Sequence, residues 1–142
     1  ESKPPHKKYY KALENQVKSG KFRAMAAVLV WHSGCLNNKC PSVLVPAGDR
    51  RMRVALKAAL AQEWPFASHI EFGSLHASSR SDFMGEFRGM LDAHPEHPFA
   101  LIHMGQLEHG EVRRLIKAHK NIHFLAAHSN TIAIAAAASA KE

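Results

Sequence analysis

Four short apolar runs recur along the chain, each rich in β-branched or aromatic residues and bounded by polar or turn-forming residues. Runs of this kind are typical of strands buried on both faces of a parallel sheet. Each run ends at or near a histidine. We therefore predict four strands, in AMAAVLVWH (24–32), PFASHIEFG (65–73), FALIHMG (99–105) and IHFLAAHSN (122–130).

Amphipathic helices are predicted around these runs, because apolar residues there recur at intervals of three and four. Asp49 is the expected cap of one helix, and Ser81 or Asp82 is the expected cap of another. Strands that alternate with helices run parallel and are joined by right-handed crossovers, which predicts an α/β fold of repeated βα units. The predicted helical segments are 9–20, ending at Gly20, then 49–62, 81–94, and 109–121, ending at Asn121.

We predict a single domain over residues 1–142, because a chain of this length supports one hydrophobic core. Residues 33–48 are predicted to form a long loop with a short strand at VLVP, 43–46. Cys35 and Cys40 lie in this loop and are assigned no role, since no second cysteine pair completes a zinc site. Residues 131–142 form an alanine-rich tail that favours a weak helix.

The formal net charge of +7 raises the hypothesis of a basic nucleic-acid-binding domain, because clustered Lys and Arg neutralise phosphates. The basic residues are dispersed over the predicted helices with few aromatic residues among them, so nucleic acid is the least favoured partner. No apolar run approaches the ~20 residues of a membrane-spanning helix, and no signal peptide is recognisable. We expect no membrane partner and favour a cytoplasmic location.

Histidines at the ends of neighbouring parallel strands share one crevice, because the loops at the carboxyl ends of the strands surround it. The candidates are His32, His69, His103 and His128. Neutral imidazole is a common ligand of divalent metals and also transfers protons near neutral pH. The period of two along a strand places Glu71 on the same face as His69, which makes them a candidate ligand pair. The sequence therefore predicts a site for metal binding or proton transfer.

Two stretches carry short motifs in a recognisable order. Residues 94–130 combine a helix ending in HP, an apolar strand ending in H-x-G, a second helix and the motif N-I-x-F, and residues 59–74 contain P-F-x-x-H. In this order the motifs resemble the amidohydrolase superfamily, specifically its amidohydrolase-related group of metal-dependent hydrolases and decarboxylases. The resemblance spans roughly residues 9–130 and is strongest after Arg50.

The resemblance implies an eight-stranded β/α (TIM) barrel with a divalent metal, usually zinc, at the carboxyl ends of the strands. It implies that His69 binds the metal and that His103 binds metal or acts catalytically on the metal-bound water and the substrate. Gly105 would lie in the substrate-binding region, where its missing side chain leaves room. The implied activity is hydrolysis of a small-molecule carboxylate, ester or amide by metal-activated water.

The chain also departs from the family's pattern. No H-x-H pair precedes His69, and the only aspartates, Asp49, Asp82 and Asp92, lie on or beside predicted helices. Four predicted strands, where a barrel needs eight, indicate a partial barrel whose edges a further segment or an oligomeric partner would cover. The alternative function is therefore a non-catalytic remnant that keeps the βα fold and acts by association with itself or with a partner.

Overall fold

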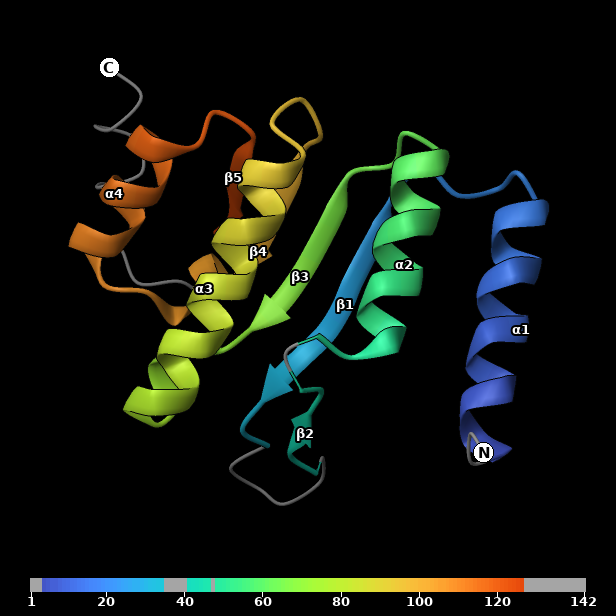
Figure 1. Cartoon of the computed structure of the whole chain (residues 1–142), viewed down its shortest axis with the longest axis horizontal. Coiled ribbons are helices and arrows are strands. Elements are labelled where there is room, and N and C mark those ends of the chain that lie inside the picture. Colours follow the sequence, from blue (N-terminus) through green and yellow to red (C-terminus); the bar gives the residue numbers. More distant parts are fainter. Residues whose placement is uncertain (1–3, 35–40, 47, 127–142) are drawn as a thin grey trace.

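The computed structural model describes residues 4–34, 41–46 and 48–126. Strands and helices alternate along most of it (Figure 1). The helices are α1 (Pro4–Lys18), α2 (Arg50–Ala61), α3 (Ala77–Ala93) and α4 (His109–Ala118). The strands are β1 (Met25–His32), β2 (Val43–Leu44), β3 (Phe66–Ile70), β4 (Phe99–Ile102) and β5 (Ile122–Leu125). Short turns follow β3 at Phe72–Ser74 and β4 at His103–Gln106.

The five strands form one sheet in the order β2-β1-β3-β4-β5. β1, β3, β4 and β5 are parallel and adjacent in chain order, whereas β2 pairs antiparallel with β1. The prediction of an α/β fold with repeated βα units is thus confirmed. Within the described residues the sheet is open, because β2 and β5 form its two edges, and a closed barrel is not observed.

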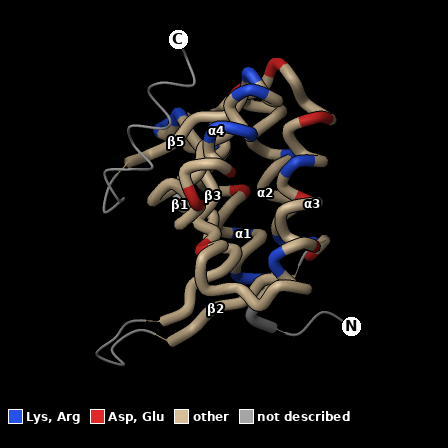
Figure 2. Tube along the Cα trace, turned by 90° about the vertical axis from the view of Figure 1, so that its left-hand side faces the viewer, with Lys and Arg blue, Asp and Glu red and all other residues tan. Residues whose placement is uncertain are grey.

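The helices supply one hydrophobic core against the sheet, with α2 and α3 on the same side of it (Figures 1 and 2). Apolar positions of each predicted helical stripe enter this core because burying them removes their surface from water. The core includes Phe66, Ile70, Phe99 and Leu101 from the strands and Ala55, Ala59, Phe87, Leu91 and Val112 from the helices.

The expectation that the strands are buried on both faces is wrong for β1, where Val30 is the only buried residue among the described side chains, and for β5. His123 and Leu125 are exposed there, while Ile122 is buried. On β4 the same alternation is milder: Phe99 and Leu101 are buried and the residues after each are half-buried. The physical reason is the placement of α2 and α3 on one side of the sheet, which leaves the other face less covered.

Of the two helix caps predicted from the sequence, one is confirmed and one is wrong. Asp49 caps α2 as predicted, since its carboxylate accepts a hydrogen bond of 2.7 Å from the backbone N–H of Arg51. The prediction of a cap at Ser81 or Asp82 is wrong, because α3 already begins at Ala77, after His76. The extra turn, residues 77–80, has no large apolar residue and no buried residue, so it carries no apolar signal of its own.

Charged residues are spread over the described part of the chain rather than gathered in one place. Figure 2 shows Lys and Arg on several helices, with Asp and Glu among them. Among the described helices, none combines the length and the apolar character needed to cross a membrane. The predicted tail at 131–142 and the two cysteines of the 33–48 loop lie outside the described residues.

Candidate metal centre

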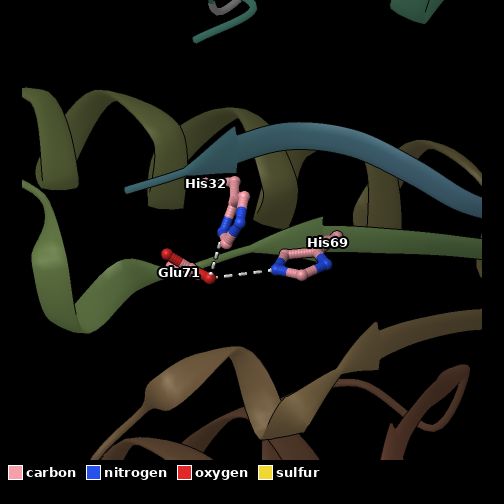
Figure 3. Close-up of side chains that lie close together, drawn as sticks. All are labelled: His32, His69 and Glu71. Atoms are coloured by element: carbon pink, nitrogen blue, oxygen red, sulfur yellow. Dashed lines mark hydrogen bonds and ion pairs between the residues drawn. The ribbon is translucent and has the colours of Figure 1, made fainter. Parts of the chain in front are cut away.

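Two neighbouring strands bring three potential metal ligands together at their carboxyl ends (Figure 3). His32 is the last residue of β1, His69 lies near the end of β3, and Glu71 follows that strand directly. His32 Nδ1 is 2.6 Å from Glu71 Oε1, and His69 Nε2 is 3.2 Å from the same oxygen. One potential ligand atom from each residue lies within 4.8 Å of the other two. In the described part of the chain, this is the group that could hold a metal ion.

Glu71 is the centre of the group. Its second oxygen, Oε2, accepts hydrogen bonds of 2.8 Å from both the backbone N–H and the hydroxyl of Ser33. Burial alone would raise the pKa of the Glu71 carboxyl, but the hydrogen bonds from Ser33, His32 and His69 outweigh it and lower this pKa to about 2. Glu71 is therefore an ionised, buried carboxylate at neutral pH.

The turn after β3 fixes the backbone of Glu71. Ser74 donates to the Glu71 carbonyl oxygen through its backbone N–H at 3.1 Å and its hydroxyl at 3.0 Å. The indole N–H of Trp31 donates in turn to the Ser74 hydroxyl at 2.7 Å. Since Trp31 directly precedes His32, this chain of hydrogen bonds connects the two strands that supply the ligands.

His103 lies next to this group. Its ring packs edge-on against the His69 ring, with 5.1 Å between the ring centroids. It does not belong to the three-ligand group. His103 begins a turn in which it and the next three residues all have φ between +53° and +64°. This conformation is unfavourable for side-chain-bearing residues, so packing must hold it. The structure therefore brings His103 to the site, and its catalytic role stays a prediction.

Gly105 lies within this left-handed turn, with φ +64°, and it is buried. A Cβ atom there would lie 3.2 Å from Leu101 Cδ1 and 3.2 Å from Phe72 Cδ2. The space beside Gly105 is thus filled by the protein's own side chains, which explains the glycine by packing and backbone conformation. Its predicted contact with a substrate stays untested.

Of the four strand-end histidines, the structure brings three together. The ring centroids of His32 and His69 are 5.4 Å apart, and His103 continues this row on the far side of His69. His128, the fourth predicted ligand, lies outside the described residues. The prediction that histidines of neighbouring strands converge is therefore confirmed for His32, His69 and His103.

The three ligands fit a divalent metal in donor type. Two imidazoles and a carboxylate are a common catalytic ligand set for zinc, with a fourth position open to water. Ligand atoms around a tetrahedral zinc ion lie about 3.3 Å apart. The 3.2 Å between His69 and Glu71 matches this spacing, whereas the 2.6 Å between His32 and Glu71 would widen by about 0.7 Å. Four donors already satisfy the Glu71 carboxylate, so its burial requires no ion.

Sequence reasoning missed the residues that support the ligands. Ser33 and Trp31 flank His32, and Ser74 follows Glu71 by three residues, yet none of them has a motif that predicts these contacts. A hydroxyl beside a candidate ligand is a weak signal, because serine is common in loops. Their role became visible only when the order of the strands placed β1 beside β3.

Comparisons with known proteins do not assign the chain to a family. No protein-family model, no curated protein and no solved structure matches the chain significantly. The resemblance to the amidohydrolase superfamily therefore rests on the sequence motifs alone.

Proposed function

We propose that the chain binds a divalent metal ion through His32, His69 and Glu71. One observation carries this proposal: three side chains of suitable donor type converge from two strands on a space small enough for one ion. The Ser33 hydrogen bonds to Glu71 Oε2 support it, because carboxylate ligands in metal sites are usually held by such outer contacts.

The finer proposal is a zinc-dependent hydrolase that acts on a small-molecule carboxylate, ester or amide. A divalent cation would supply Lewis acidity, polarising a carbonyl group and lowering the pKa of a coordinated water. His32, His69 and Glu71 would hold the ion, and His103 would exchange a proton with a substrate; the packing of the His103 ring against His69 supports this role. The resemblance to the amidohydrolase-related group supports this activity.

We also propose that the open sheet is part of a β/α barrel. Parallel strands that are adjacent in chain order are the arrangement found in a β/α barrel, and the strands β1, β3, β4 and β5 have it. We propose that the edges of this open sheet are covered by further β/α units or by a second copy of the chain. Sedimentation of the purified protein tests the second possibility, since a monomer at all concentrations would exclude self-association.

Metal binding is tested by titrating the metal-free protein with Zn²⁺ in a calorimeter and measuring retained metal after dialysis. We expect one ion per chain in the wild type and a large loss of affinity in His69→Ala. His123→Ala is the control, because His123 is exposed on β5 and the group of ligands does not include it. Failure of the wild type to bind Zn²⁺, Mn²⁺ or Co²⁺ would refute the proposal.

A further inference from the structure

The turn that carries Glu71 is held from outside the site by Arg80. This arginine lies in the first turns of α3, and its Nε–H donates to the carbonyl oxygen of Phe72 at 3.1 Å. The same carbonyl accepts the backbone N–H of Leu75 at 3.3 Å. This carbonyl group belongs to the Phe72–Gly73 peptide, the second peptide after Glu71, so the contact holds the turn that directly follows Glu71.

A second contact keeps the Arg80 side chain in place. Its two terminal nitrogens pair with the two carboxylate oxygens of Glu111, each at 2.8 Å. Glu111 also accepts the backbone N–H of Glu108 at 3.0 Å, as part of the capping box that begins α4. The two terminal nitrogens of the guanidinium group therefore bind Glu111, while its Nε–H binds the Phe72 carbonyl oxygen. Lysine cannot reproduce this combination, because it has a single nitrogen.

The turn packs against the core on one side, through Phe72, while Gly73 and Ser74 are exposed. The Phe72 side chain is fully buried, and the Arg80 guanidinium lies 5.9 Å from its ring centre. A Cβ atom on Gly73 would approach the carbonyl oxygen of Gln106 to 3.1 Å, so the turns after β3 and β4 lie directly against each other. Arg80 thus connects this turn to α3 and, through Glu111, to α4.

We propose that Arg80 is a positioning residue for the metal site, which sets the geometry of Glu71 through the Phe72 carbonyl without touching the ion. This inference rests on the proposed metal binding. It predicts that loss of the Arg80 side chain loosens the turn and lets Glu71 depart from the arrangement in which its Oε1 faces both His32 and His69. Metal affinity should then fall although every ligand is still present.

The test compares two arginine variants that lose the same kind of ion pair. Arg80→Met removes the contacts with Phe72 and Glu111. The matched control is Arg51→Met, because Arg51 also forms a two-point pair with a carboxylate, that of Asp49, at 3.0 and 2.9 Å. The two arginine side chains have similar exposure, 29% for Arg80 and 32% for Arg51. Their effects on general stability should therefore be comparable.

Each full-length variant is titrated with Co²⁺ well below its unfolding temperature, following both the affinity and the visible spectrum of the bound ion. We expect Arg80→Met to bind Co²⁺ on the order of tenfold more weakly than the wild type, as loss of outer contacts usually does, and with an altered spectrum. Arg51→Met should match the wild type in both. Arg80→Lys keeps the positive charge but not the two-pronged guanidinium group, so its Co²⁺ affinity should lie between those of Arg80→Met and the wild type. It replaces Arg80→Met in the test if that variant does not fold.

The outcomes separate this inference from the proposed function. Wild-type affinity and an unchanged spectrum in Arg80→Met or, if that variant does not fold, in Arg80→Lys would overturn the positioning role while leaving metal binding intact. An equal loss of affinity in Arg51→Met would also overturn it, because the effect would then follow general stability. A wild type that binds no Co²⁺ would overturn the metal site itself, and the role of Arg80 with it.

Discussion

Replacing Glu71 with glutamine tests whether this side chain is the structural centre of the site even without metal. Glutamine has nearly the same shape, but it has one accepting oxygen and an NH₂ group that only donates. In the wild type, Oε1 accepts from His32 and His69, and Oε2 accepts from Ser33 twice. If the new NH₂ group faces Ser33, the Ser33 backbone N–H loses its acceptor; if it faces His32 and His69, both rings can accept from it only after a change of tautomer. In either orientation the hydrogen bonds that remain lose the charge of the carboxylate.

The expected cost follows from the kind of bonds that are lost. A hydrogen bond to a charged group contributes about 1.5–3 kcal/mol, roughly twice the value for a neutral pair. Side chains that lose a hydrogen bond can turn towards water, because the contacts between Ser33 and Glu71 are only part-buried. The cost is therefore less than the sum of all the weakened hydrogen bonds. We therefore expect Glu71→Gln to lower the free energy of unfolding by about 1.5–3 kcal/mol, the equivalent of one such bond.

Urea unfolding of the metal-free protein, in the presence of a chelator, measures this loss directly. Glu14→Gln is the control, since Glu14 makes a 2.6 Å pair with Lys18 on the exposed surface of α1. Exposed pairs of this kind add little, so the control should unfold at the wild-type urea concentration. If Glu71→Gln also unfolds there, the reasoning that its four hydrogen bonds organise the site is wrong.

Four further variants test local features of the fold. Gly105→Ala should destabilise the protein by more than Gly20→Ala, because both positions have φ +64° but only the former has packed atoms at 3.2 Å from the new Cβ; equal urea midpoints would contradict this. Gly85 and Gly89 lie in the interior of α3, and nothing lies within 4 Å of a Cβ atom at either position, so Gly85→Ala and Gly89→Ala should each raise the free energy of unfolding by about 0.4–1 kcal/mol. A lower urea midpoint in either variant would contradict this. The hydrogen bond from its arginine partner lowers the pKa of Asp49 from 3.8 to about 2, so its charge stabilises the fold above pH 3.8 and this contribution is lost as the pH falls towards 2. The difference in urea midpoint between wild type and Asp49→Asn should therefore shrink over that pH range, and a constant difference would contradict the pKa shift.

The strands and the class of fold could be predicted from the sequence because their signals are local. Each apolar run is too short for a buried helix and is bounded by turn residues, and the runs alternate with amphipathic segments. The start of α3 could not be predicted, because residues 77–80 contain no large apolar residue and so lack the periodicity that marks an amphipathic helix. The prediction of full burial failed for β1 and β5 because periodicity does not show which faces of a sheet the helices cover.

The site was predictable only in part for a similar reason. His69 and Glu71 lie two residues apart, so the geometry of a strand brings them together. His32 is 39 residues from Glu71, and only the pairing of β1 with β3 places them 2.6 Å apart. In the left-handed turn at His103–Gln106, Gly105 is the one residue whose type indicates a positive φ, and the other three residues disfavour that conformation. Tertiary packing overrides their local preference.

The most direct test of the metal site is a crystal structure of the protein grown with Zn²⁺, with anomalous diffraction measured at the zinc absorption edge. We predict one strong anomalous peak in contact with His32 Nδ1, His69 Nε2 and the Glu71 carboxylate. A peak elsewhere, for example beside His119 and Asp92, or no peak next to Glu71 with His32 Nδ1 still hydrogen-bonded to Oε1, would contradict it.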